Sequence, residues 1–271
     1  MVIEYRVFGA DAPRIPELAS ELIRLGTDVF VVPDGLVAVG VHRVTSTIPI
    51  ITHSAGDLVA TGLAASVGRP GGNVTGLQVM LTEIGGKHLS WLREIVPSLS
   101  RVGVLVGQPG FSEAQAPPTH PTVAYIREIR FAALSSGLQP QVVVVAKGDE
   151  FAAAFSAFKA QRAQAIVLYG NFIWPFRKTI VALAVEHRLP TIAVNDAMLP
   201  EGILMTYGWD REINFRLAAE FVDRILRGTK AGDIPIQQPT IFRLGINLKT
   251  AKALGLTIPP SLLARADQVI D

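Results

Sequence analysis

The stretch IPIITHSAGDLVATGLAASVGRPGGNVTGLQ, residues Ile48–Gln78, places polar and glycine residues at the ends of two apolar runs. Ile48–Thr52 has the length and apolar character of a short strand, and the polar segment His53–Asp57 follows it directly. The segment Pro70–Asn73 predicts a tight turn before a second strand, Val74–Leu77, because glycine and asparagine adopt positive φ at little cost. These strand ends, with their side chains and bare backbone, predict the rim of a ligand site.

Strand-like and helix-like segments alternate before this stretch. Val2–Val7 (VIEYRV) alternates as a strand does, and apolar residues at helical spacing predict a helix over Ile15–Leu25. A buried strand, Asp28–Val32, and a weaker helix that ends near Thr45 complete a β-α-β-α-β order. Such an order predicts a parallel sheet covered on both faces, with ligands bound beyond the carboxyl ends of its strands.

The alternation resumes after a helix over residues 82–96 and a polar link, Ser98–Arg101, which we take as a lobe boundary. The later strands are predicted at Val102–Val106, Val142–Val145, Ala165–Tyr169, Thr191–Val194, Gly202–Gly208 and Thr240–Ile246. Between Asp210 as cap and Gly228 as stop, a helix is predicted whose buried stripe is Ile213, Leu217, Phe221 and Ile225. The chain is therefore predicted to be an α/β protein of two doubly wound, parallel-sheet lobes with a ligand cleft between them.

The composition excludes several classes of partner. The 271 residues include 25 Lys and Arg against 23 Asp and Glu, a formal net charge of +2, and the basic residues are dispersed, which argues against nucleic acid. The chain has no Cys, and its five His form no metal-ligand spacing, so neither a metal nor a cofactor is expected. His88 and His187 are interpreted as helix-surface residues. No apolar run approaches the roughly 18 to 20 residues of a membrane helix, so direct membrane insertion is not expected.

Polar side chains follow most of the predicted strands at their carboxyl ends. Their amide, carboxylate and aromatic groups together suit a small polar or zwitterionic ligand. The candidate ligand-binding residues are Asp34, Ser54, Gly56, Asp57, Gly76, Gln78, Gln108, Asn171, Asn195, Asp196 and Tyr207.

His53 and Asp57, four residues apart at a strand end, admit three interpretations. They could act as base and orienter in catalysis, although the chain has no G-x-S-x-G elbow to supply a nucleophile. They could make only loop hydrogen bonds, with Asp57 capping a short helix. The favoured interpretation is contact with a ligand. The loop Arg69–Asn73 lacks the G-K-[ST] ending of a phosphate loop, so a structural turn is favoured there.

Several segments resemble one known family. They are TSTIPI (Thr45–Ile50), GD (Gly56–Asp57), RPGGNVTGL (Arg69–Leu77), RLP (Arg188–Pro190) and INLKTAKALGLTIPPSLLARADQVI (Ile246–Ile270). On these residues, and over almost its whole length, the chain is similar to the ABC-transporter substrate-binding proteins of the tryptophan/tyrosine-binding-like family. The resemblance implies a type I periplasmic-binding fold, in which two lobes joined by crossing strands close on a small ligand like a Venus flytrap.

The resemblance also implies a domain arrangement. Residues 1–100 plus 206–234 would form the first lobe and residues 101–205 plus 235–271 the second, with hinge links near Ser98–Arg101, Tyr207–Asp210 and Gln238–Thr240.

By resemblance the protein is the solute-binding component of an ABC importer, without catalysis. It would act in the periplasm, bind a small ligand such as an aromatic or branched amino acid, and deliver it to the permease subunits in the membrane. Two alternatives stay open: an effector-sensing domain of a regulator, and an α/β enzyme that uses His53 and Asp57.

Three departures from the family pattern are visible. Family members carry a signal peptide, a first strand and a first helix before the segment that matches Val2–Arg6, so the first lobe is expected to be incomplete at its N-terminus and to expose strand edges. A start codon assigned too late is the favoured explanation, ahead of a degenerate copy or completion by a partner. Pro33-Asp34-Gly35 replaces a small-residue and threonine turn, so a hydroxyl contact expected at Gly35 is lost, and Asn195-Asp196-Ala197 replaces a charged segment.

Overall fold

The computed structural model describes residues 2–9, 11–79, 81–118 and 120–271 of the chain. Contacts between residues divide the chain into two compact units. Unit 1 comprises Met1–Met80, Ser112–Tyr125 and Asp210–Thr240, and unit 2 comprises Leu81–Phe111, Ile126–Trp209 and Ile241–Asp271. Residues 81–100, which the sequence analysis groups with the first lobe, belong to unit 2 in this division.

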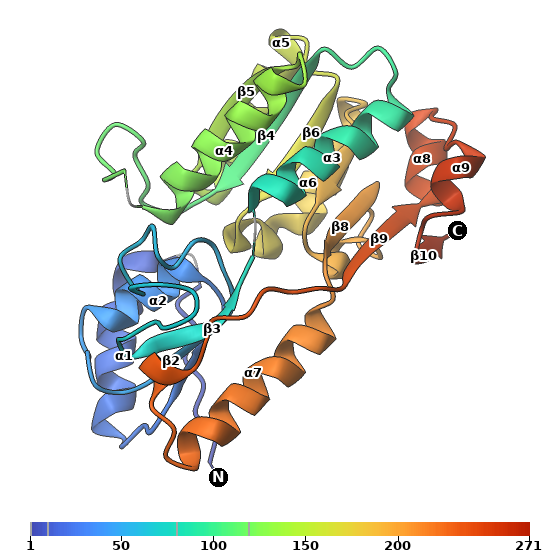
Figure 1. Cartoon of the computed structure of the whole chain (residues 1–271). Helices are drawn as coiled ribbons and strands as arrows, with labels where there is room; N and C mark the ends of the chain where they lie inside the picture. The colour runs from blue at the N-terminus through green and yellow to red at the C-terminus, as the bar shows by residue number, and fades with distance from the viewer. Residues whose placement is uncertain (1, 10, 80, 119) are drawn as a thin grey trace. The chain divides into compact units, whose positions relative to one another are not determined.

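Unit 1 contains a three-stranded parallel sheet with the strand order β1-β2-β3 (Figure 1). Its elements are η1 (Ala12–Arg14), α1 (Ile15–Arg24), β1 (Phe30–Val32), α2 (Gly35–His42), β2 (Ile50–Ala55), β3 (Val74–Gln78), α7 (Arg211–Leu226) and η5 (Ala231–Asp233). From α1 onward the predicted order of helix, strand, helix and strand is confirmed, with strands shorter or shifted by a few residues.

The two faces of β2 bury different clusters of apolar side chains. Ile50 belongs to a cluster with Ile15 of α1 and Ala38 of α2. Its neighbour Ile51 belongs to a second cluster, with Phe221 of α7. Because successive side chains of a strand point to opposite faces, helices cover this sheet on both sides, as predicted.

Unit 2 contains a seven-stranded sheet with the order β10-β9-β8-β7-β6-β4-β5, in which only β8 and β9 pair antiparallel among the described strands. Its elements are α3 (Leu81–Ile95), β4 (Arg101–Gly107), α4 (Pro121–Ser135, whose first residues count with unit 1), β5 (Gln139–Val145), η2 (Gly148–Glu150), α5 (Phe151–Ala160), β6 (Ala165–Tyr169), η3 (Asn171–Phe176), α6 (Arg177–Glu186), β7 (Thr191–Ala193), η4 (Asp196–Met198), β8 (Met205–Trp209), β9 (Phe242–Asn247), α8 (Leu248–Leu254), α9 (Pro260–Leu263) and β10 (Gln268–Ile270). Strand β5 lies at one edge of this sheet and the short β10 at the other.

The core of unit 2 is built on aromatic side chains of α5. Phe151, Phe155 and Phe158 are fully buried in a cluster that includes Leu105 of β4 and Ile166 of β6. Helices α3 and α4 lie on the viewer's side of the sheet in Figure 1. Helix α3 packs against β6, β7 and β8, which explains why residues 81–100 group with unit 2.

Helix α7 begins as predicted but buries a different stripe. The Asp210 side chain accepts a hydrogen bond from the Ile213 backbone N–H at 3.0 Å, so the predicted cap is confirmed. The buried residues of the helix are Asn214, Ala218, Phe221 and Ile225. The first two predicted positions, Ile213 and Leu217, are therefore wrong by one residue each. Asn214 faces inward instead and donates to the His53 carbonyl of β2.

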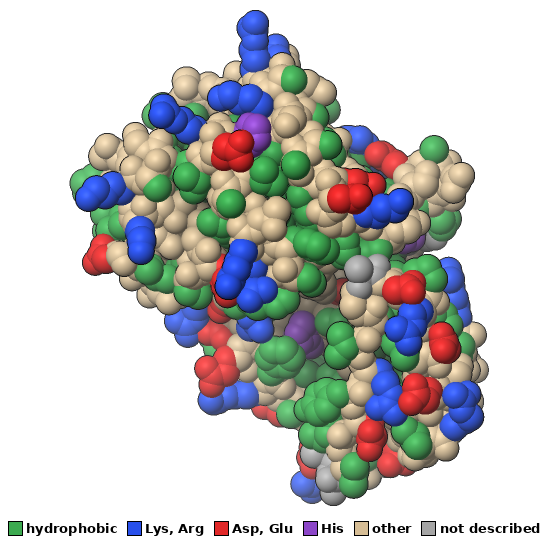
Figure 2. All heavy atoms as spheres, turned by 180° about the vertical axis from the view of Figure 1, so that it is seen from behind, with side chains coloured by type: hydrophobic (Ala, Val, Ile, Leu, Met, Phe, Trp, Pro, Cys, Tyr) green, Lys and Arg blue, Asp and Glu red, His purple; other side chains and the backbone are tan. Residues whose placement is uncertain are grey.

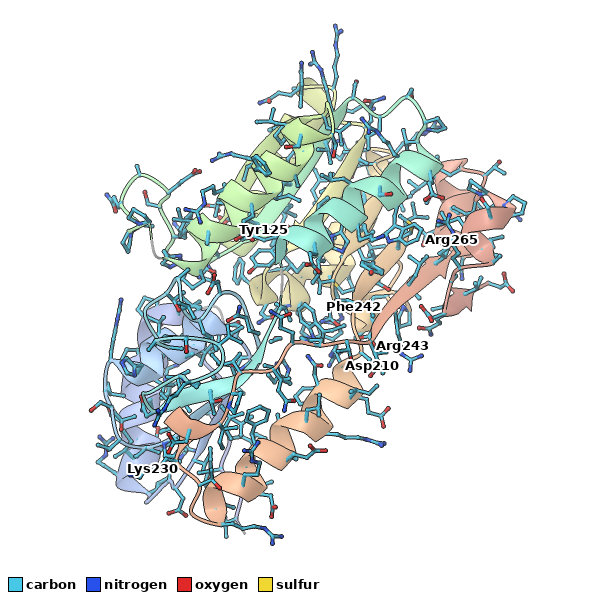
Figure 3. All side chains as sticks on the ribbon, viewed as in Figure 1. Tyr125, Asp210, Lys230, Phe242, Arg243 and Arg265 are labelled. Atoms are coloured by element: carbon cyan, nitrogen blue, oxygen red, sulfur yellow. The ribbon has the colours of Figure 1, made fainter. Side chains whose placement is uncertain are left out.

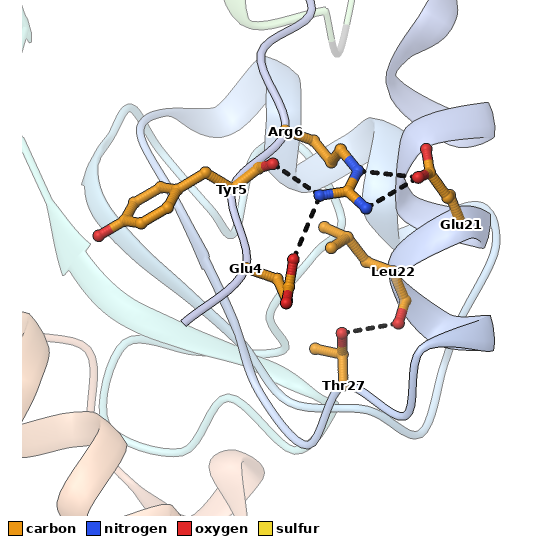
Figure 4. Close-up of polar contacts among 6 residues, drawn as sticks. All are labelled: Glu4, Tyr5, Arg6, Glu21, Leu22 and Thr27. Carbon is orange, nitrogen blue, oxygen red and sulfur yellow. Dashed lines mark hydrogen bonds and ion pairs between the residues drawn. The ribbon is translucent and has the colours of Figure 1, made fainter. Parts of the chain in front are cut away.

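The strand predicted over Val2–Val7 is wrong. These residues form no strand, and the side chains of Val2 and Val7 are 85% and 83% exposed. Arg6 holds the segment to α1 through two bonds to Glu21 Oε1, at 3.0 and 2.8 Å (Figure 4). A segment of alternating apolar residues forms a strand only where a neighbouring strand satisfies its backbone hydrogen-bonding groups. Among the described strands β1 pairs with β2 alone, so no strand pairs with Val2–Val7.

The end of β2 also differs from its predicted position. The strand was expected to stop at Thr52 but continues to Ala55, so His53 and Ser54 are strand residues. Turns rather than a short helix follow Asp57. The predicted strand Val74–Leu77 is confirmed, with Gln78 added at its end.

Replacement of Gly76 tests how closely β2 and β3 approach each other. Gly76 has φ +123°, and a Cβ there would lie 2.2 Å from the Thr52 carbonyl oxygen and 2.6 Å from its nitrogen. These are backbone atoms that no side-chain rotation can move, so Gly76→Ala should lower the free energy of unfolding by about 3 kcal/mol. The measurement is urea-induced unfolding followed by circular dichroism.

Gly86→Ala on α3 is the matched control. A Cβ at this position would meet no other atom within 4 Å, and a helix favours alanine over glycine by about 0.5–1 kcal/mol, so this variant should be slightly stabilised. Equal stability of the two variants would contradict the close approach at Gly76.

Candidate functional site

The carboxyl ends of β1, β2 and β3 meet at one edge of the sheet in unit 1, because the three strands run parallel. The structure brings five of the predicted site residues to this edge: Asp34, Ser54, Gly56, Asp57 and Gln78. Gly76 lies inside β3, where it permits the close pairing with β2.

Asp34 and Ser54 shape this edge through bonds to the backbone. The Asp34 side chain caps α2 by accepting from the Val37 N–H at 2.9 Å. The Ser54 hydroxyl donates to the Pro33 carbonyl at 2.6 Å and so ties the end of β2 to the end of β1. A ligand at this edge would meet polar groups whose orientation is already set.

Asp57 and Gln78 organise the loop that follows β2. Asp57 is exposed, and its Oδ1 accepts from the N–H groups of Val59 and Ala60 at 2.9 Å each. Gln78 is only 4% exposed, and its Oε1 accepts from the Leu58 N–H at 3.0 Å. Asp57 is therefore the accessible carboxylate of this edge, and Gln78 is a mostly buried amide whose Oε1 holds the loop.

His53 lies near the carboxyl end of β2 with a half-buried ring. The ring of Phe215 packs edge-on against it, with centroids 4.4 Å apart, and Asn214 Nδ2 donates to the His53 carbonyl at 3.1 Å. Burial lowers the pKa of His53 to about 4; the nearby Pro33 carbonyl acts against this shift, and the charge of Arg211 adds to it. The imidazole is therefore neutral at neutral pH.

The loop Arg69–Asn73 is a structural turn held by bonds to the protein interior. The carbonyl groups of Thr45 and Ile48 accept from Asn73 Nδ2 at 3.1 and 2.7 Å, and Asn73 is 6% exposed. The Gly71 N–H donates to the Gly232 carbonyl at 3.0 Å. The turn thus fastens β3 to its surroundings, as the favoured interpretation expected.

A second edge of strand ends occurs in unit 2. Gln108, Asn171 and Asn195 follow β4, β6 and β7, which are parallel neighbours in the sheet. Gln108 is only 8% exposed, whereas Asn171 is exposed. Asn195 caps η4 by accepting from the Ala197 N–H at 3.0 Å, and the predicted site residue Asp196 begins that turn.

Tyr207 lies within β8 rather than beyond a strand end. Its ring stacks on Phe242 at a centroid distance of 5.9 Å and lies 5.9 Å from Trp91 and 6.2 Å from His88. The guanidinium of Arg265 covers the far side of this row, 4.8 Å from the centroid of Trp91; Figure 3 labels Phe242 and Arg265. The row packs α3 against β8 and β9.

His88 and Tyr207 both keep their neutral forms at neutral pH. His88 is 1% exposed, so its interpretation as a helix-surface residue is wrong. Burial lowers the pKa of His88 to about 4, partly offset by its Nε2 bond to the Tyr207 carbonyl, 2.7 Å long. Burial, followed by the charges of Asp267 and Glu83, raises the pKa of Tyr207.

The surface of the described residues gives little sign of other chemistry. Basic and acidic side chains are interspersed over the face drawn in Figure 2. Within residues 2–9, 11–79, 81–118 and 120–271, no group of three potential ligands could hold a metal ion. No helix of the described chain is both long and apolar enough to cross a membrane. A groove of about 570 Å³ in unit 2, between α3 and the turn before β5, contains none of the predicted site residues.

Parallel α/β sheets with polar groups beyond their strand ends are the architecture of small-molecule binding proteins. The chain belongs to the family of ABC transporter substrate binding proteins, whose model matches residues 3–270. It is accordingly a solute-binding component of an ABC importer, with a small-molecule ligand and permease subunits as partners.

Known proteins similar to the chain agree with this family. A tyrosine-binding protein from Clostridioides difficile (strain R20291) is 25% identical over 255 residues, which cover 94% of this chain and 70% of the relative. An ABC domain from Streptococcus pneumonia in complex with L-Trp and a conserved domain protein from Vibrio cholerae O1 biovar eltor share the fold. Each has a TM-score of 0.84 and 24% identity, over 96% of this chain and 84% of the other.

The depressed pKa values of His53 and His88 predict a pH-dependent stability. The unfolded state takes up a proton near pH 6.5 at each histidine, whereas the folded state does so only near pH 4. Between these values the unfolded state binds more protons, so the free energy of unfolding should fall as the pH is lowered from 6.5 toward 4. At pH 5 the loss should be about 2 kcal/mol for each histidine.

Urea unfolding between pH 4.5 and 8 measures this slope, and His88→Phe should reduce it. The variant also loses the bond to the Tyr207 carbonyl, so the slope rather than the absolute stability is the readout. An unchanged slope in His88→Phe would contradict the assignment of a buried, neutral His88.

Proposed function

We propose that the chain binds a free amino acid with an aromatic side chain and delivers it to the permease of its transporter. The observation that carries this proposal is the set of carboxylate, amide and hydroxyl groups at the carboxyl ends of the parallel strands. The tyrosine-binding relative supports the same class of ligand. The proposed contacts are Asp34, Ser54, Gly56, Asp57, Gly76 and Gln78 in unit 1, and Gln108, Asn171, Asn195, Asp196 and Tyr207 in unit 2.

Asp57 is the best candidate for the contact with the ligand's ammonium group. Within the described residues, both hydrogen bonds that the Asp57 side chain accepts go to Oδ1. Oδ2 is therefore left for a ligand. The side chain is exposed at the sheet edge, and charge-assisted bonds from an ammonium group to a carboxylate are the stronger class of hydrogen bond.

An enzyme that uses His53 and Asp57 is less well supported. A base and its orienter need a direct hydrogen bond. The Asp57 carboxylate instead accepts from the backbone N–H groups of Val59 and Ala60, and no hydrogen bond joins it to His53 among the described residues. The family points to a binding protein rather than to an enzyme, and it does not support a regulator.

Lobe closure and periplasmic localisation belong to the same proposal. Substrate-binding proteins of ABC importers act outside the cytoplasmic membrane, and closure would bury the ligand before it is handed over. The lobe boundaries and hinge links given above remain predictions.

A thermal-shift screen against the twenty L-amino acids, with sugars and polyamines measured beside them, tests the ligand class. Ligand at about one hundred times its Kd stabilises the folded state by about 2.7 kcal/mol, so tyrosine or tryptophan should raise the melting temperature by roughly 5–10 °C. The D-enantiomers are the control for non-specific effects. A shift with sugars or polyamines and none with amino acids would overturn the proposed ligand class.

Asp57→Asn tests the ammonium contact. Asparagine can still cap the loop through Oδ1 but carries no charge, so the melting temperature without ligand should change little while the affinity falls at least about tenfold. Asp233→Asn, an exposed position in unit 1, is the matched control and should bind as the wild type does. Equal affinities of the two variants would remove Asp57 from the site.

A further inference from the structure

The amino edge of the unit 2 sheet, where its parallel strands begin, is rich in positive charge. The four turns that enter β4, β5, β6 and β7 contain no Asp or Glu; they are residues 96–100, 136–138, 161–164 and 187–190. These strands are parallel neighbours, so the turns lie side by side. The basic edge, as we call it, is defined by four exposed cations: Arg101, Lys159, Arg162 and Arg188.

Arg162 and Arg188 follow helices α5 and α6 in a left-handed conformation that glycine usually adopts. Their φ angles are +59° and +52°, and no other non-glycine residue of the described chain has a positive φ. Four other helices, α1, α4, α7 and α8, carry glycine at the same place after their last turn: Gly26, Gly137, Gly228 and Gly255. Arginine has a conformational cost there that glycine avoids, which indicates a task for its side chain.

The cations of the basic edge keep their full charge. None of the four forms an ion pair with another described residue. Arg101 Nη1 donates to the Gln161 carbonyl at 3.1 Å, and Lys159 Nζ donates to the His187 carbonyl at 3.5 Å. These bonds to neutral carbonyl groups tie neighbouring turns together. Figure 1 draws α5 at the top of the view, and several Lys and Arg side chains gather at the upper end of the face in Figure 2.

The helix dipole explains only part of this pattern. Each helix runs back from the carboxyl edge to enter the next parallel strand, so the negative carboxyl ends of α5 and α6 lie at the basic edge. A basic residue in the last turn stabilises such an end in an ordinary helical conformation, as Lys159 does in α5. Arg162 and Arg188 lie beyond the last turn, and the dipole gives no reason for their left-handed conformation.

We propose that the basic edge binds the anionic headgroups of a phospholipid bilayer. Neighbouring strands lie about 4.8 Å apart, so the charges are spread along a row of turns. The groove of unit 2 contains none of the four cations. A row of unpaired cations without acidic residues suits a surface that presents many phosphate groups, because each Lys or Arg near such a surface adds to binding. The permease of the transporter lies in a membrane, and this contact keeps the protein beside it.

Co-sedimentation of the full chain with lipid vesicles tests the proposal. One set of vesicles contains phosphatidylcholine and phosphatidylglycerol in equal parts, and the other contains phosphatidylcholine alone. The wild type should bind the anionic vesicles and not the neutral ones. Binding should fall as NaCl is raised from about 0.15 M to about 1 M, because salt shortens the reach of each charge.

The double variant Arg162→Gly with Arg188→Gly removes two charges from the basic edge without strain. It should bind the anionic vesicles about twentyfold more weakly, since each basic residue near an anionic surface contributes about fivefold. Glycine fits both left-handed positions, so the melting temperature should not fall. Lys147→Gln with Lys178→Gln is the matched control and should bind as the wild type does. It removes the same charge from exposed positions near the opposite ends of α5 and α6.

The remaining outcomes decide against the proposal. Full binding by the glycine variant, or an equal loss in the control, overturns the role of the basic edge. Equal binding to the two kinds of vesicle, or binding to neither, overturns anionic headgroups as the partner. Release of the protein by sodium phosphate, but not by NaCl of the same ionic strength, would identify a site for a free phosphate ion instead of a bilayer. The proposed amino-acid ligand is tested separately, by the thermal-shift screen.

Discussion

Parallel pairing of short, apolar strands is the constraint on which both units depend. In unit 1 it aligns β1, β2 and β3 so that every carboxyl end falls at one edge, and in unit 2 it does the same for β4, β6 and β7. The backbone pairing of β2 with β3 is close enough that only glycine fits at position 76. Loops at such an edge contribute few side chains to the hydrophobic core, so their polar residues can vary without loss of the fold.

Short polar side chains at these edges have a structural task before any ligand arrives. Asp34, Asn195 and Asp210 each cap a helix, and Asp57 closes a series of turns. The first N–H groups of a helix need such acceptors, which is why these residue types follow strands so often. A polar residue beyond a strand is thus as much a sign of local folding as of recognition. The distinction lies in which oxygen or nitrogen the fold leaves unoccupied.

Much of the fold could be predicted from local pattern, and the failures have non-local causes. The apolar run Ala165–Tyr169 defines its strand at both ends, whereas the mostly exposed residues Gln268–Ile270 form a strand only by pairing with β9. Val2–Val7 has the alternation of a strand, but no neighbouring strand among the described residues pairs with its backbone. For the candidate site, position at a strand end was predictable. The contact between His53 and Asn214, 161 residues apart, depends on tertiary structure and carried no local signal.

The edge position of β5 bears on how copies of the chain meet at high concentration. The N–H of Gln139 donates inward to the Ser100 carbonyl at 2.8 Å, so the next residue, Pro140, presents its backbone outward. Proline has no N–H, and the first outward position of this strand therefore offers no donor to an incoming strand. Without Pro140, the valine-rich edge strand β5 would offer unpaired backbone groups to a strand of another copy. Pro140 interrupts that pairing at its start and so disfavours aggregation through the unit 2 sheet.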